Sequence, residues 1–73
     1  MKNIKFVICI ENSEYQVSLE KRKIYEVLPD SDATKTDQIR VIDESGEDYL
    51  YPASWFVDAK LSKETQAAVI KAA

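Results

Sequence analysis

Short apolar runs separated by polar turns are the feature that most restricts how this chain can fold. The runs dominate the first four-fifths of the sequence and are rich in β-branched and aromatic residues. Such runs, bounded by polar turns, predict β-strands. The predicted strands cover residues 4–10, 15–19, 24–28, 39–42 and 49–51. Five short strands with tight connections in a chain of 73 residues favour a small barrel or a strongly bent sheet.

The clearest turn lies between the last two predicted strands. Residues 43–48 are polar and carry Ser45 and Gly46 at the tip, and glycine accepts the positive φ that a tight hairpin requires. Pro29 ends the preceding strand, because it has no N–H group to donate to a neighbouring strand. Residues 29–38 are polar without an apolar pattern, so they predict a loop.

The end of the chain changes character and predicts a helix over about residues 62–72. Ser62 is a suitable N-cap, and the alanines that follow are strong helix formers. A free helix of this length is marginal in water. It must therefore dock through Leu61, Val69 and Ile70, bind a partner, or fray. We interpret the chain as one domain, in which the strands occupy about residues 4–60 and this helix follows them.

The composition excludes most catalytic chemistry. The chain has no histidine, one cysteine and one glycine, so it lacks an imidazole base, a Cys-rich zinc site and a Gly-rich phosphate loop. The acids at residues 43–48 do not have the spacing of an EF-hand calcium loop. We therefore expect no enzyme activity, no catalytic residue, no cofactor and no metal site.

Charge and hydropathy restrict the partners. The chain has 10 Lys and Arg against 13 Asp and Glu, for a net charge of −3, which argues against nucleic-acid binding. The apolar run at residues 6–10 is too short for a membrane span or a signal-peptide core. We expect no membrane contact and a cytoplasmic location. Cys9 lies within this run and is expected to be a buried core residue.

Two segments resemble SH3 domains. Residues 17–28 resemble the diverging turn and second strand of that family, and residues 39–57 resemble the remainder, ending in the string Leu50-Tyr51-Pro52-Ala53-Ser54-Trp55-Phe56-Val57. The resemblance implies a mainly β fold, a small five-stranded SH3-like barrel with a short C-terminal helix. The sequence resembles small stand-alone bacterial SH3-like proteins of unknown role more closely than it resembles signalling modules. Only Pro52 and Trp55 of the family's proline-binding groove carry over.

The aromatic residues near this ending suggest a protein-binding surface. Some of these rings are expected to lie in the core and the others to form an exposed platform, because aromatic residues anchor interfaces. Residues 26–58 hold nine acids against two bases, a net charge of −7, so acids accompany the platform. The predicted binding residues are Tyr49, Tyr51, Pro52, Trp55, Asp43 and Glu44. The alternative interpretation of the acids is an ordinary solvated surface that discourages strand-edge pairing.

The residues therefore predict a non-catalytic protein-interaction module or small accessory subunit. Its partner would be a protein with Lys or Arg beside apolar or proline side chains, because these complement an aromatic and acidic surface. The alternative is a purely structural subunit that docks permanently into a larger complex through its C-terminal helix.

Overall fold

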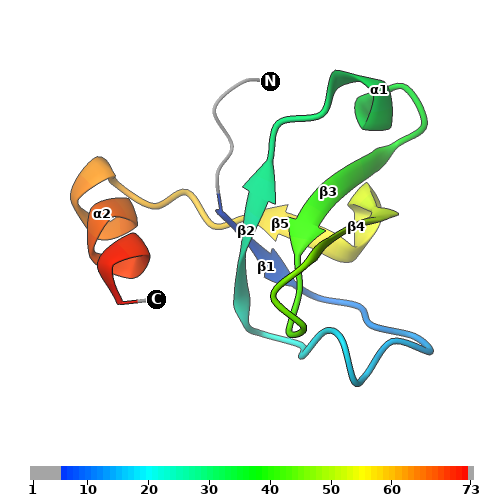
Figure 1. The fold of residues 1–73 in the computed structure, drawn as a ribbon, viewed down its shortest axis with the longest axis horizontal. Coiled ribbons are helices and arrows are strands. Elements are labelled where there is room, and N and C mark those ends of the chain that lie inside the picture. The colour runs from blue at the N-terminus through cyan, green and yellow to red at the C-terminus, as the bar shows by residue number, and fades with distance from the viewer. Residues whose placement is uncertain (1–5, 73) are drawn as a thin grey trace.

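A bent antiparallel sheet forms the body of the protein (Figure 1). The computed structural model describes residues 6–72, and within them five strands are arranged in the order β4-β3-β2-β1-β5. The elements in chain order are β1 (Phe6–Cys9), β2 (Ile24–Leu28), α1 (Ser31–Thr34), β3 (Gln38–Ile42), β4 (Asp48–Pro52), the 3-10 helix η1 (Ala53–Trp55), β5 (Phe56–Asp58) and α2 (Lys63–Lys71). The mainly β class and the short C-terminal helix are thus confirmed.

The sheet consists of two halves that share β2. One half pairs β5, β1 and β2, and the other pairs β2, β3 and β4. Among the described residues β4 and β5 are the two edges and are not paired with each other, so the sheet is open. The chain passes between these edges through η1, which brings the two ends of the sheet toward each other (Figure 1).

Four of the predicted strands are present at or near their predicted positions. Strand β2 has the predicted bounds, and β3 and β4 extend the predicted ranges 39–42 and 49–51 by one residue or two. Strand β1 lies within the predicted range 4–10, whose residues 4–5 lie outside the described part of the chain. The hairpin turns as expected, since Gly46 has a φ of +86° and its N–H donates to Asp43 O over 2.9 Å.

The strand predicted at residues 15–19 is wrong. This segment forms turns, in which the Ser18 and Leu19 N–H groups both donate to Tyr15 O, over 3.0 Å and 2.8 Å. Leu19 is fully buried, whereas Val17 is 92% exposed, so the alternation of side chains does not mark two faces of a strand. The fifth strand is β5 instead, which follows η1 and pairs with β1.

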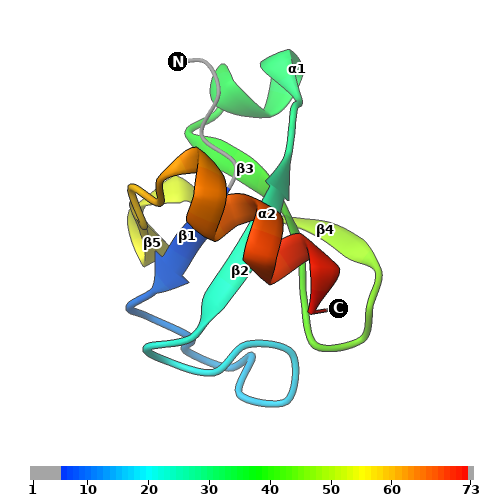
Figure 2. The same cartoon turned by 90° about the vertical axis from the view of Figure 1, so that its left-hand side faces the viewer.

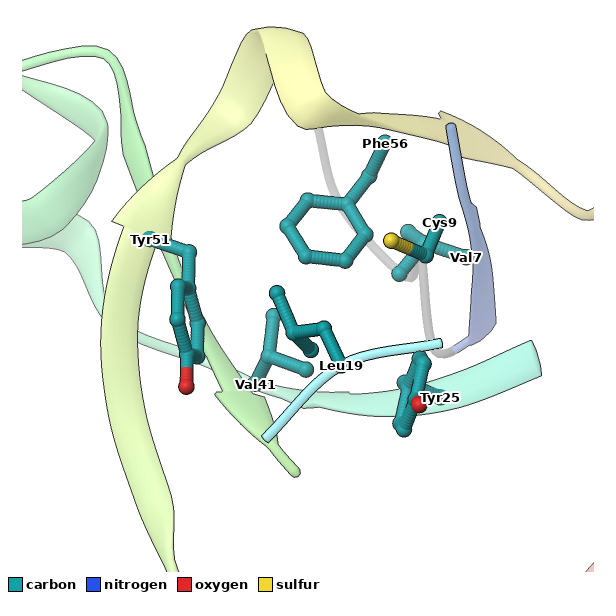
Figure 3. Close-up of a cluster of buried hydrophobic side chains, with 7 residues drawn as sticks. All are labelled: Val7, Cys9, Leu19, Tyr25, Val41, Tyr51 and Phe56. Atoms are coloured by element: carbon teal, nitrogen blue, oxygen red, sulfur yellow. The ribbon is translucent and has the colours of Figure 1, made fainter. Parts of the chain in front are cut away.

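The core fills the concave side of the bent sheet. Every strand contributes to it, and the loop before β2 adds Leu19. Figure 3 shows these side chains pointing toward one another: Val7, Cys9, Leu19, Tyr25, Val41, Tyr51 and Phe56. The burial predicted for Cys9 is confirmed, since this residue has no exposed surface.

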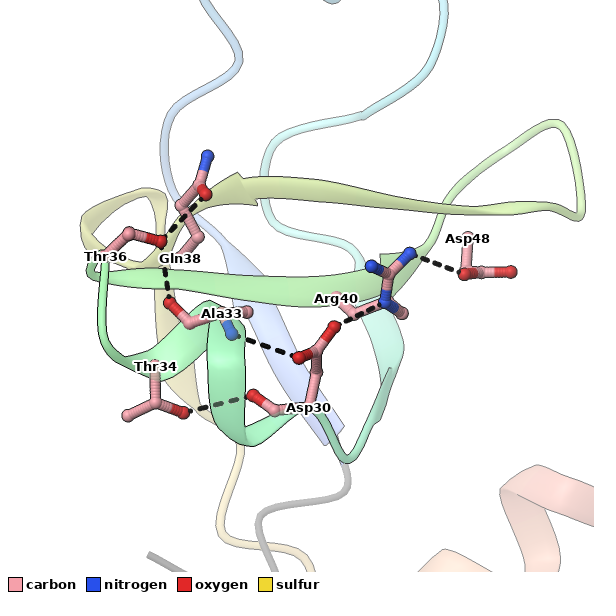
Figure 4. Close-up of polar contacts among 7 residues, drawn as sticks. All are labelled: Asp30, Ala33, Thr34, Thr36, Gln38, Arg40 and Asp48. Atoms are coloured by element: carbon pink, nitrogen blue, oxygen red, sulfur yellow. Dashed lines mark hydrogen bonds and ion pairs between the residues drawn. The ribbon is translucent and has the colours of Figure 1, made fainter.

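A short helix interrupts the loop predicted at residues 29–38. Asp30 caps α1 by accepting a hydrogen bond from the Ala33 N–H over 3.0 Å. The same carboxylate accepts from Arg40 Nε on β3 over 2.8 Å, and Arg40 Nη1 donates to Asp48 over 2.9 Å (Figure 4). Arg40 therefore ties the helix cap to β3 and β4.

Helix α2 stands beside the β1 and β2 side of the sheet (Figures 1 and 2). Its start confirms the predicted cap, because Ser62 Oγ accepts from the Thr65 N–H over 3.1 Å. No residue of α2 is buried. No helix in the described chain has the length and apolar character needed to cross a membrane.

Candidate aromatic binding surface

The turn that follows β4 places Trp55 beside the core. After Pro52 the chain forms η1, and the Ala53 N–H donates to Asp37 O over 2.8 Å. On the other side, Trp55 O accepts from the Ile10 N–H over 2.8 Å. A short turn therefore follows Pro52, and backbone hydrogen bonds on both sides hold it in place.

Three aromatic rings meet at this turn. The centroid of Trp55 lies 5.7 Å from that of Tyr15 and 6.2 Å from that of Tyr51, and the Tyr15 and Tyr51 rings contact edge to face at 5.6 Å. Tyr15 is 48% exposed and Trp55 is partly buried, whereas Tyr51 is only 4% exposed. We use the term aromatic surface for the accessible rings of Tyr15 and Trp55 together with Pro52, which directly follows Tyr51 in the chain.

The rings of the aromatic surface are in mutual contact. Centroid distances below 7 Å with tilted or perpendicular planes are those of packed aromatic pairs. Rings packed in this way leave no gap between them for an inserted ring or ammonium group. A ligand would therefore lie across the exposed parts of the Tyr15 and Trp55 rings.

Tyr51 and Asp43, two of the predicted binding residues, lie beneath this surface. The Tyr51 hydroxyl donates to Asp43 Oδ2 over 2.6 Å, and Asp43 is only 6% exposed. Burial acts to raise the pKa of Asp43, but hydrogen bonds from Ser45 and Tyr51 outweigh it and leave that pKa below its ordinary value. Burial and the hydrogen bond to Asp43 raise the pKa of Tyr51 to about 12. The pair stabilises the hairpin and offers no contact surface.

Glu44, a third predicted residue, joins the hairpin to the rest of the protein. Its Oε2 accepts from Lys23 Nζ and from the Tyr25 hydroxyl, each over 2.6 Å. These two hydrogen bonds lower the pKa of Glu44. Its backbone N–H donates to Ser18 O over 2.9 Å, in the loop that carries Tyr15. The carboxylate is therefore paired with a cation of its own chain.

Of the three remaining predicted residues, two lie in the aromatic surface and one lies outside it. Pro52 and Trp55 adjoin each other at η1 and belong to the aromatic surface. Tyr49 is 49% exposed, but its hydroxyl donates to Glu47 Oε1 over 3.0 Å and its ring is not part of the three-ring group. Tyr15 is not among the predicted binding residues, because the alternation at residues 15–19 predicts a strand, and no local signal distinguishes it from the fully buried Leu19.

A shallow depression adjoins the aromatic surface. It is lined by residues of the loop before β3 and of the turn after β4, namely Thr36, Asp37, Gln38, Pro52, Ala53 and Ser54. Pro52 belongs to both features, so the aromatic surface and the depression are continuous. Among residues 6–72, no group of three or more Cys, Asp or Glu side chains is placed to share a metal ion.

No protein-family model matches this chain, and neither a curated protein nor a solved structure matches it.

Proposed function

We propose that this protein is a non-catalytic, cytoplasmic protein-interaction module or small accessory subunit that binds its partner through the aromatic surface. The observation that carries this proposal is the contact between Tyr15 and Trp55. These residues are distant in the sequence and come together at the surface, where both rings remain accessible. Exposed aromatic anchors of this kind supply much of the free energy of binding at protein interfaces.

An SH3-like barrel is the architecture we propose for the fold. Three features support it: the two halves of the sheet that share β2, the hairpin with Gly46 at its tip, and the 3-10 turn between Pro52 and β5. Arg22 is a departure from that family, because it stands where SH3 domains have the glycine of the diverging turn, but its φ of +71° is one that a glycine adopts readily. An L residue adopts this backbone conformation only where its surroundings require it.

The chemistry of the surface suggests a partner with Lys or Arg beside apolar or proline side chains. Apolar and proline residues would pack on Tyr15, Pro52 and Trp55. Residues 26–58, which include Pro52 and Trp55, carry nine acids against two bases. This negative charge attracts a cationic partner and disfavours nucleic acid. Because solvent ions screen this attraction, the association rate should fall as salt is added.

Selection of peptides from a displayed random library on the intact protein tests the proposal. The selected peptides are then measured against the wild type, Tyr15→Ala, Trp55→Ala and the matched control Tyr49→Ala. We expect Trp55→Ala to weaken binding by about 2 kcal/mol or more, as for a central aromatic anchor, and Tyr49→Ala to change it little. Circular dichroism confirms that each variant is folded. A folded Trp55→Ala variant that binds at full strength would contradict the proposal.

Helix α2 favours a second candidate, a structural subunit that docks permanently into a larger complex. A nine-residue helix is marginal in water by itself, and α2 has no buried residue. Its Ile70 side chain is more than half exposed. If α2 is the docking element, Ile70→Glu should release the protein from its complex during gel filtration of a cell extract, whereas Trp55→Ala should not. The opposite result would favour the aromatic surface.

A further inference from the structure

The outer face of the sheet carries a row of apolar side chains across three strands. Ile8 on β1 lies opposite both Ile24 on β2 and Val57 on β5. Paired residues of neighbouring strands point to the same face of a sheet, and successive residues of one strand point to opposite faces. Because Val7 and Phe56 point into the core, these three side chains point outward. We use the term apolar row for Ile8, Ile24 and Val57; Ile24 is 39% exposed and Val57 is 45% exposed.

Helix α2 stands outside these strands and does not bury its own apolar side chains there (Figures 1 and 2). Val69 is only partly buried, and Ile70 is more than half exposed. Apolar side chains stabilise a protein in proportion to the area that they remove from water. The apolar row and α2 therefore both keep apolar surface that a closer contact would bury.

The segment between β5 and α2 is short and strained. The Ala59 N–H donates to Phe6 O over 3.0 Å, which holds the chain on the sheet up to that residue. Ser62 is already the N-cap of α2, so only residues 60 and 61 lie between these two fixed points. Lys60 has a φ of +53°, which is unfavourable for an L residue. A short connection under strain favours exchange of the element that it carries.

Charges on α2 and beside the apolar row are complementary but are not paired with each other in the described residues. Glu26 lies two residues from Ile24 on the same face of β2. Helix α2 carries Lys63 and Lys71 against one acid, Glu64. Among residues 6–72 none of these four charged side chains is in an ion pair. A basic helix that packs closely on the apolar row would therefore also neutralise Glu26.

We propose that two copies of this chain exchange α2, so that the α2 of each copy packs Val69 and Ile70 on the apolar row of the other. Exchange of an identical element is a low-energy route to a symmetric dimer, because each contact that one copy gives up is made again by the other. Extension of residues 59–62 relieves the positive φ of Lys60 in both copies. This inference goes beyond the proposed function and does not involve the aromatic surface.

The test measures the molar mass of the full chain by light scattering after it is refolded from urea at a series of protein concentrations. We expect a dimer whose share rises with concentration. Ile24→Glu should abolish the dimer, and so should the double variant Val69→Glu/Ile70→Glu. Val17→Glu is the matched control, because Val17 is 92% exposed outside both elements and should leave the dimer intact. Circular dichroism checks folding, and Val57→Glu takes the place of Ile24→Glu if that variant is unfolded.

Refolding the two disrupted variants together distinguishes the exchange of α2 from other dimers. A mixed dimer keeps one intact contact, between the unchanged α2 of the Ile24→Glu copy and the unchanged apolar row of the other copy. The mixture should therefore form a dimer that neither variant forms alone. A contact between two helices or between two apolar rows would not be restored, since one of its sides would still be altered.

Lys60→Gly tests the strained connection. Glycine adopts a positive φ readily, so this variant keeps α2 beside its own sheet without strain, and we expect the dimer to be weakened by about tenfold. The matched control is Arg22→Gly, which relieves a φ of +71° far from this connection in the sequence and should leave the monomer–dimer equilibrium unchanged.

Three results would overturn the exchange of α2. They are a wild type that is monomeric at every concentration, a dimer that persists in the folded variants of the apolar row, and a mixture of the two variants that stays monomeric. Equal effects of Lys60→Gly and Arg22→Gly would also contradict it. Trp55→Ala should leave the dimer unchanged, so its loss of peptide binding bears on the proposed function alone.

Discussion

The hydroxyl of Tyr51 on β4 donates to the Asp43 carboxylate at the end of β3 over 2.6 Å, inside the protein. Asp43 also accepts from the Ser45 N–H over 2.9 Å and from the Ser45 hydroxyl over 2.6 Å, so one buried carboxylate holds both the strand and the tip of the hairpin. A buried carboxylate is stable only if its hydrogen bonds are made. Asp43 and Tyr51 are consequently best understood as residues that stabilise the fold beneath the aromatic surface.

Removal of the Tyr51 hydroxyl should destabilise the protein. Tyr51→Phe leaves one Asp43 oxygen without its donor, which typically costs about 1–3 kcal/mol of unfolding free energy. Urea denaturation followed by circular dichroism measures the loss. The matched control is Tyr49→Phe, which removes an exposed hydroxyl bound to Glu47 and should leave the urea midpoint nearly unchanged. Equal midpoints for the two variants would show that the Tyr51–Asp43 bond adds no stability.

Stability should fall at acidic pH because Asp43 and Glu44 have pKa values below their ordinary values of 3.8 and 4.5 in the folded protein. A group whose pKa is lowered by folding contributes stability above its unfolded value and loses it as pH falls through the folded value. The loss should therefore begin near pH 4.5 and continue below pH 3.8. Urea midpoints measured from about pH 7 downward follow it.

Replacement of Glu44 tests its share of this acid sensitivity. Glu44→Gln removes the titrating carboxylate that Lys23 and Tyr25 stabilise, so the variant should be less stable at neutral pH. Its stability should also depend less steeply on pH than that of the wild type. Parallel pH profiles for the two proteins would show that Glu44 does not contribute to the acid transition.

The Cys9 thiol should react slowly in the native protein. It has no exposed surface, and burial raises its pKa, so few molecules carry an accessible thiolate. Labelling with an aromatic disulfide reagent should be slow in buffer and fast in concentrated urea. Equally fast labelling in both conditions would contradict the buried position of Cys9.

Local chemistry accounts for the parts of the fold that the sequence predicted well. Gly46 permits the hairpin turn, Pro29 directly follows the last residue of β2, and Ser62 caps α2 through its own side chain. Each of these signals acts within a few residues of its position. Such features are accessible without knowledge of the tertiary structure.

The features that were missed depend on distant partners. The segment containing Leu19 has the alternation of a strand, but burial of that one side chain in the core is compatible with turns and leaves Val17 in solvent. Asp43 resembles a surface acid until Tyr51 is placed against it. The contact between Tyr15 and Trp55 joins a loop near the start of the chain to a turn near its end. Pairings of this kind are set by the path of the whole chain.

The Tyr15 ring should shield Trp55 from solvent, and this shielding is measurable without a partner. Trp55 is the single tryptophan, so its fluorescence reports on this surface alone. Tyr15→Ala removes a ring whose centroid lies 5.7 Å from that of Trp55, which should increase quenching by neutral acrylamide. The loss of ring contacts should lower the unfolding free energy by only about 0.5–1.5 kcal/mol beyond the contribution of the buried area that is lost, so the variant should remain folded.

Tyr49→Ala is the matched control, because the Tyr49 ring does not contact Trp55 in the described structure, and it should leave quenching unchanged. Equal quenching of the wild type and a folded Tyr15→Ala variant would contradict the arrangement of the aromatic surface.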